Sequence, residues 1–187
     1  MKSYLITDPA YYGNDAARLE ESLEAAYRRH SVDVALFRDK QTSIYPDLAR
    51  IFIDVSRRHN IGKTILHGDP LLAHQFGADG VHLTSHQHMT IHEAKSLGLY
   101  VIISTHTHLE AMIAEQAGAD AITYSPIFPS PDKGEPKGLE DLKEIVAKIN
   151  IPIFALGGIT TEDQKQAVAE CGVYGFASIR YFTDNSI

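Results

Sequence analysis

The sequence contains a single cysteine, Cys171, in a chain of 187 residues. One thiol excludes an intrachain disulfide and a cysteine-based zinc cluster. We expect Cys171 to be a small buried residue in a turn between a helix and a strand.

The sequence also lacks an excess of basic residues and a long apolar segment. Asp and Glu outnumber Lys and Arg by 24 to 17, so the formal net charge is -7. This balance argues against a general nucleic-acid-binding surface, although a local basic pocket remains compatible with it. No run approaches the roughly 18 to 20 apolar residues that span a bilayer, and no signal segment opens the chain. We therefore expect no membrane association, a cytoplasmic location and one domain over residues 1–187.

Short apolar runs, many of them β-branched, recur along the chain and predict eight strands. They lie at residues 4–7, 32–37, 64–66, 80–83, 101–103, 121–124, 152–156 and 174–177. Most of the intervening segments have helical spacing of apolar residues, as at Leu19, Leu23, Ala26 and Tyr27. Alternation of buried strands with amphipathic helices predicts an α/β fold, and eight repeats favour a TIM (β/α)8 barrel over a doubly wound sheet.

Residues near the ends of the predicted helices support this division. Asp15, Ser43 and the segment 160–163 are expected to begin helices. Segments 75–80 and 116–121 are near-copies in which a glycine ends a helix before a strand, and segment 171–175 is a looser third copy. Because only about ten residues follow the last strand, the last helix is expected to be short or missing. The exposed flank that results suggests a possible homo-oligomer.

In β/α barrels the loops that follow the strands form the active site. Gly157 and Gly158 follow the seventh predicted strand and lead into a helix, an arrangement typical of phosphate binding but also of a plain tight turn. Arg38 and Lys40 end the second strand and suit a phosphate or diphosphate, the alternative being a solvated loop. The loop 125–138 carries hydroxyl and lysine donors and is either a functional lid or an uncommitted linker.

These features occur within an ordered series of motifs over nearly the whole chain. The series resembles the thiamin phosphate synthase and thiazole tautomerase superfamily. It comprises Tyr4-Leu5-Ile6-Thr7-Asp8, Phe37-Arg38-Asp39-Lys40, Gly77-Ala78-Asp79-Gly80-Val81-His82-Leu83, Ser104-Thr105-His106, Pro126-Ile127-Phe128-Pro129-Ser130 with Lys133, Gly138-Leu139, Pro152-Ile153-Phe154-Ala155-Leu156-Gly157-Gly158-Ile159 and Gly175-Phe176-Ala177.

The resemblance implies a phosphorylated small-molecule substrate and two groups of binding residues. One group, expected to contact a thiazole phosphate, is Gly158, Ile179 and Arg180. The other, expected to line the pocket for substrate and diphosphate, is Arg38, Lys40, Ser104, Ser130 and Lys133.

The chain departs from the synthase pattern where magnesium ligands are expected. The resemblance implies Asn-Asp after the third strand and another aspartate after the fourth, whereas this chain has His67-Gly68 and Gln87. Magnesium prefers carboxylate oxygens, so we expect no metal site unless Asp69 substitutes through a shift of the loop. Gly68 resembles tautomerase-type members of the superfamily.

We therefore expect a tautomerase-like enzyme that acts on thiazole phosphate without a cofactor. Its proton shuttle would be His67 or His106, since Pro126 stands where some tautomerases have a histidine. A divergent, magnesium-dependent thiamin phosphate synthase and a barrel that only binds a thiamin-related phosphate remain alternatives, and a sugar-phosphate isomerase is disfavoured by the motif series. His88 and His92 are weak candidates for a metal pair beside His86, against an exposed polar loop.

Overall fold

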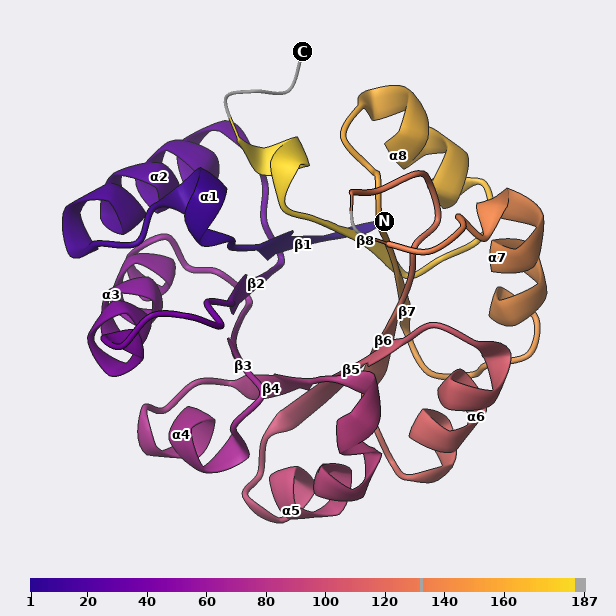
Figure 1. The fold of residues 1–187 in the computed structure, drawn as a ribbon, viewed down its shortest axis with the longest axis horizontal. Coiled ribbons are helices and arrows are strands. Elements are labelled where there is room, and N and C mark those ends of the chain that lie inside the picture. Colours follow the sequence, from indigo (N-terminus) through magenta and orange to yellow (C-terminus); the bar gives the residue numbers. More distant parts are fainter. Residues whose placement is uncertain (132, 184–187) are drawn as a thin grey trace.

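The protein is a closed barrel of eight parallel strands, as expected from the sequence (Figure 1). The computed structural model describes residues 1–131 and 133–183. Each strand pairs with its neighbours in chain order, and the first strand closes the barrel by pairing with the last. The strands are β1 (Lys2–Ile6), β2 (Val34–Phe37), β3 (Lys63–His67), β4 (Gly80–Leu83), β5 (Tyr100–Thr105), β6 (Ala121–Tyr124), β7 (Ile153–Leu156) and β8 (Gly175–Ser178).

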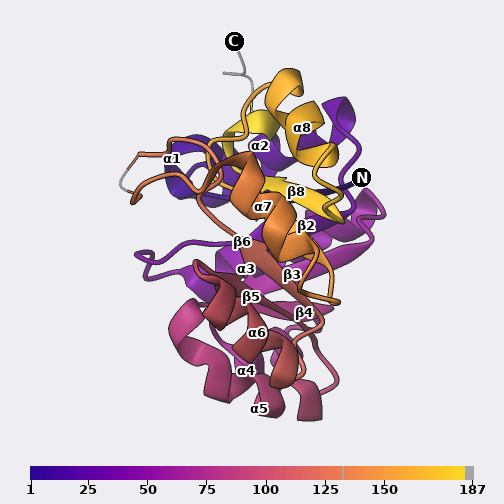
Figure 2. The same cartoon turned by 90° about the vertical axis from the view of Figure 1, so that its right-hand side faces the viewer.

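Helices surround the barrel and cover the outer face of the strands (Figures 1 and 2). They are α1 (Pro9–Tyr12), α2 (Ala16–Arg29), α3 (Tyr45–Arg58), α4 (Pro70–Gln75), α5 (Ile91–Ser96), α6 (His108–Gln116), α7 (Gly138–Val146) and α8 (Glu162–Ala169). Two 3-10 turns add to them, η1 (Ser85–Thr90) and η2 (Arg180–Phe182). After β8 the described chain contains only η2, which confirms the short or missing last helix; residues 184–187 lie outside the described part.

Two of the expected helix starts are confirmed and one is wrong. The side chains of Asp15 and Thr161 cap α2 and α8 by accepting backbone N–H groups, at 3.0 and 3.3 Å. Ser43 does not begin a helix, because α3 starts at Tyr45 with a proline in its first turn, where a missing N–H costs no hydrogen bond. The sequence reasoning also missed α1, which Asp8 caps by accepting the N–H of Ala10 at 3.0 Å.

The repeated turn between helix and strand is architectural, as predicted. Gly77 and Gly118 have φ angles of +68° and +88°, the left-handed conformation that ends a helix at little cost for glycine. The aspartate two residues after each glycine ties two strands together. Asp79 accepts the backbone N–H of Thr64 at 2.7 Å, and Asp120 accepts that of Val101 at 2.7 Å.

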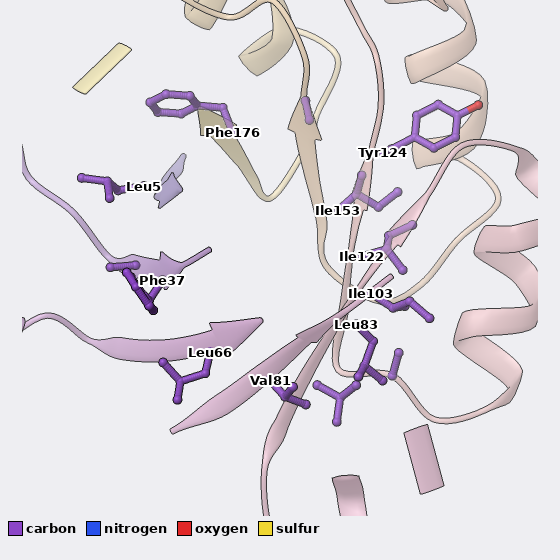
Figure 3. Close-up of a cluster of buried hydrophobic side chains, with 14 of the residues drawn as sticks. Leu5, Phe37, Leu66, Val81, Leu83, Ile103, Ile122, Tyr124, Ile153 and Phe176 are labelled. Atoms are coloured by element: carbon purple, nitrogen blue, oxygen red, sulfur yellow. The ribbon is translucent and has the colours of Figure 1, made fainter. Parts of the chain in front are cut away.

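Alternating side chains of the strands form two apolar layers. Outward-facing residues such as Leu5, Phe37 and Ile122 pack against the helices (Figure 3). Inward-facing residues, among them Tyr4 and Phe154, fill the interior of the barrel. The interior is therefore a packed core, and a ligand has room only where the strands end.

Cys171 is buried and unpaired, as expected for a filler in the turn that follows α8. Within residues 1–131 and 133–183, no helix has the length and apolar character needed to cross a bilayer.

Candidate functional site

A cavity of about 690 Å³ opens at the carboxyl ends of the barrel strands, within the size range of small-molecule sites. The predicted catalytic and substrate-binding residues all line it, and they come from the ends of six different strands or from the loops that follow them. They are Arg38, Lys40, His67, Ser104, His106, Ser130, Lys133, Gly157, Gly158, Ile179 and Arg180.

Three cations lie in one part of this cavity. Arg38 and Lys40 follow β2, and Lys133 comes from the loop after β6. The positive charge of Arg38, then burial and the charge of Lys133, lower the pKa of Lys40. Arg38 donates to Asp8 at 3.3 Å, and Asp8 is the one carboxylate among the described lining residues. An excess of positive charge in a recess favours an anionic ligand.

The Gly157-Gly158 turn forms another part of the wall, after β7. Both glycines have positive φ, +103° and +70°. A Cβ atom at Gly158 would lie 2.7 Å from the Pro129 carbonyl oxygen, and one at Gly157 would lie 2.7 Å from Pro126 Cα. The glycines are therefore needed for the close approach of the loop 125–138, in addition to any exposure of backbone to a phosphate.

Hydrogen bonds hold this loop and the end of β8 against the turn. Phe128 donates its backbone N–H to the Gly157 carbonyl at 3.0 Å. Ser178 donates its hydroxyl to the Ile159 carbonyl at 2.7 Å and accepts the N–H of Tyr181 at 3.1 Å. This arrangement places Ile179 and Arg180 beside the glycine turn, where both line the cavity.

The buried His82 lies at the floor of the cavity and was missed as a site residue. Its Nδ1 lies 2.7 Å from the Tyr4 hydroxyl, and its Nε2 lies 2.9 Å from the Ser104 hydroxyl. Burial, with smaller effects from His67 and Arg38, lowers its pKa to about 3. The sequence placed His82 in a predicted strand, two residues after Gly80. It did not show that the side chain points into the barrel, because that direction depends on strand register.

The two histidines proposed as proton shuttles have different surroundings. The Nδ1 atom of His67 is buried and has no hydrogen-bond partner among the described residues. Burial, then the charges of Arg38 and Lys40, lower the pKa of His67 to about 4, so it is neutral at pH 7. His106 is held through its Nδ1 atom, 3.1 Å from the carbonyl oxygen of Ser125.

The low pKa values of His67 and His82 predict acid destabilisation. In the unfolded chain both histidines bind a proton below about pH 6.5. In the folded protein His67 resists protonation until about pH 4 and His82 until about pH 3, so the stability of the fold decreases as the pH is lowered through this window. Between pH 7.5 and pH 5 each histidine should cost about 2 kcal/mol of unfolding free energy.

Urea unfolding of the wild type and of His67→Gln at both pH values tests this prediction. Between pH 7.5 and pH 5, the decrease in unfolding free energy that His67 and His82 cause should be about half as large in His67→Gln as in the wild type. His88→Gln, at an exposed position, is the matched control and should keep all of it. An equal loss in wild type and His67→Gln would contradict the assignment.

The donor set of the cavity does not fit magnesium, which the resemblance to synthases implies. The amide of Gln87 donates to the Gly68 carbonyl at 2.7 Å and accepts the N–H of Thr84 at 3.0 Å. Asp69 does not replace the missing acids, because it is not among the described residues that line the cavity and its Oδ1 atom caps α4 by accepting the N–H of Leu72. Asp8 is engaged by Arg38 and by the N–H of Ala10.

The histidine-rich segment does not form a metal centre in the described part of the chain. His88 lies in η1 and His92 in α5, so they do not share the regular helical face on which the metal interpretation relied. No group of three or more metal-ligating side chains occurs among residues 1–131 and 133–183.

The protein is a closed β/α barrel whose cation-lined cavity lies at the strand ends, an arrangement that suits an anionic small molecule. The family model described as thiamine monophosphate synthase matches residues 3–182. The chain belongs to this family.

Individual relatives agree with this membership. The thiamine-phosphate synthase of Clostridium novyi is 34% identical, over 98% of this chain and 91% of the relative. The putative thiamine-phosphate synthase 2 of Aquifex aeolicus is 42% identical, but the match covers only 57% of this chain and 59% of that protein. This chain thus spans less than two thirds of some of the relatives it matches.

Solved structures support the same fold. A thiamine phosphate pyrophosphorylase from Pyrococcus furiosus matches with a TM-score of 0.79 and 28% identity, over 95% of this chain and 85% of that one. The N-acetylmannosamine-6-phosphate 2-epimerase of Clostridium perfringens has a TM-score of 0.74 at 13% identity, over 97% of this chain and 86% of that one, which shows a shared fold alone.

Proposed function

We propose that this chain, as one barrel domain over residues 1–187, joins hydroxymethylpyrimidine diphosphate to thiazole phosphate and releases diphosphate. The observation that carries the proposal is that one cavity has, at different strand ends, two groups of residues suited to bind anions. Arg38, Lys40 and Lys133 form one, and the Gly157-Gly158 turn with Arg180 forms the other. Two phosphorylated substrates need two such regions, whereas isomerisation of a single monophosphate needs one.

The transfer can be written with the atoms of the two substrates alone. The bond between the pyrimidine methylene carbon and the diphosphate oxygen breaks, and its electron pair leaves with the diphosphate. The ring nitrogen of the thiazole uses its lone pair to bond to that carbon and becomes a thiazolium cation. Because no proton is removed, the protein must orient two rings and stabilise the leaving anion. Arg38, Lys40 and Lys133 would stabilise the leaving diphosphate.

This proposal differs from our first expectation, a tautomerase. Neither the family model nor the relatives support the tautomerase assignment, and their names favour the synthase alternative. In a transfer that moves no proton, His67 and His106 contact and position the substrates and do not act as acid or base. His67 is neutral at pH 7, so it adds a hydrogen-bonding group beside the cations without changing the charge of the cavity.

Purified protein mixed with both substrates tests the proposal. We expect thiamin phosphate and diphosphate in equal amounts, measured by chromatography and by a coupled assay for diphosphate. His106→Gln keeps a polar side chain that can still form hydrogen bonds at this position, and it should retain most of this activity because no proton transfer depends on the imidazole. Isomerisation of a thiazole carboxylate phosphate that disappears in His106→Gln would support the tautomerase instead. Binding of thiazole phosphate without any conversion would support a barrel that only binds.

A further inference from the structure

The end of the cavity proposed to hold the diphosphate is lined by cationic side chains, whereas a magnesium site is lined by carboxylates. The three cations are Arg38, Lys40 and Lys133, and Arg38 already engages Asp8, the one carboxylate among the described lining residues. We propose that these side chains neutralise a bound diphosphate directly, in place of a divalent metal ion. The inference rests on the proposed function only for the identity of the anion.

The positions where a synthase is expected to place acids hold a contact within the protein. The Gln87 amide spans from η1 to the loop after β3 and donates to the Gly68 carbonyl at 2.7 Å. Its oxygen is also occupied, since it accepts from the backbone N–H and the hydroxyl of Thr84, at 3.0 and 3.1 Å. Both ends of this amide are therefore committed to joining two loops.

The space around Gly68 could hold the side chain of an acidic residue, so packing does not require a glycine there. A Cβ atom at Gly68 would meet nothing within 4 Å. The φ angle of +79° disfavours most side chains but is tolerated better by Asp and Asn than by others. An acid at this position would add negative charge next to His67, which lines the cavity and feels the charges of Arg38 and Lys40, so glycine leaves this end of the cavity positive.

The cations themselves are placed for an anion. Lys40 and Lys133 are both exposed and both line the cavity. They come from distant parts of the chain, Lys40 from the loop after β2 and Lys133 from the loop after β6. The mutual repulsion that lowers the pKa of Lys40 also means that an anion between the cations would relieve an unfavourable arrangement. Guanidinium and ammonium groups both bind phosphate oxygens through charge-assisted hydrogen bonds.

Calorimetric titration with inorganic diphosphate, first in EDTA and then in excess magnesium, tests the proposal. The dissociation constant in EDTA should be equal to or lower than that in magnesium. Lys40→Ala and Lys133→Ala should each weaken binding about 10-fold to 100-fold. Lys143→Ala, an exposed lysine of α7 that pairs with Glu140, is the matched control and should bind as the wild type does. Binding that requires magnesium would overturn the inference.

A second pair of variants tests the charge argument independently. Gly68→Asp combined with Gln87→Asp should weaken diphosphate binding in EDTA at least 10-fold, and magnesium should restore it. Gly68→Asn combined with Gln87→Asn alters the same backbone and the same contact without adding charge, and should lack both effects. Unchanged binding of the diaspartate variant in EDTA would contradict a role for the cations.

The outcome separates this inference from the proposed function. Metal-free binding of diphosphate in a protein that forms no thiamin phosphate would support the inference and contradict the proposed transfer. Product formation that depends on magnesium, with diphosphate binding that also depends on it, would do the reverse.

Discussion

Gly158→Ala should reduce product formation about 100-fold or more, a loss of the size expected when a substrate-binding group moves by about 1 Å. The new methyl group would lie 2.7 Å from both the Phe128 Cβ atom and the Pro129 carbonyl oxygen. Because Phe128 also donates its backbone N–H to the Gly157 carbonyl, relief of this overlap must displace Phe128 and Pro129 together. We expect this displacement to move Ser130, the next residue, from its place in the cavity wall. Steady-state kinetics of diphosphate release measures the effect.

Gly98→Ala is the matched control for this prediction. Gly98 has a φ angle of +77°, close to the +70° of Gly158, but a Cβ atom there would meet nothing within 4 Å. Both variants therefore pay a similar backbone strain, about 1 kcal/mol of unfolding free energy, and only Gly158→Ala also disturbs the loop. Gly98→Ala should keep wild-type kinetics. Equal activity in the two variants would show that the loop contact has no part in the site.

The barrel was predictable because its local signals and its topology agree. Gly77 and Asp79 show why: the glycine ends a helix in a conformation that few other residues adopt, and the aspartate joins the following strand to the preceding one. A repeated turn of this kind imposes a repeated helix and strand, and eight such units favour a closed barrel over an open doubly wound sheet. The short helix α1 also had a signal, since Asp8 followed by Pro9 is a typical cap and first residue, but it is too short for helical periodicity.

The candidate residues were predictable as a set, and their contacts were not. Every strand end of a parallel barrel opens at the same face, so Arg38 and Gly158 had to lie around one cavity. The contact between Gln87 and Gly68 depends on the path of two loops, which residue spacing does not determine. The buried direction of His82 and the approach of Lys133 to Lys40 depend on register and loop conformation in the same way. The departure at Gly68 was visible in the sequence, but it does not by itself distinguish a tautomerase from a synthase that holds diphosphate without metal.

Arg38→Ala should cause the largest loss of activity among single side-chain removals, about 100-fold to 1000-fold in kcat/KM. A charge-assisted hydrogen bond to an anion contributes about 1.5–3 kcal/mol. Removal of Arg38 has a further cost, because its partner Asp8, 3.3 Å away, would remain in the cavity as an unpaired negative charge that repels the same anion. Arg38→Lys keeps the charge but not the planar guanidinium, so its loss should be smaller.

The contribution of Asp8 can be separated with a second substitution. Asp8→Asn keeps the cap of α1, because an asparagine oxygen can still accept the N–H of Ala10, and it removes the charge. In the Arg38→Ala background it should recover about 10-fold of the lost kcat/KM, whereas in the wild type it should have little effect. Arg28→Ala, which breaks an exposed pair with Glu24 on α2, is the control and should leave kinetics unchanged. No recovery in the double variant would mean that Arg38 acts only by direct contact with the substrate and that its pairing with Asp8 does not tune the charge of the cavity.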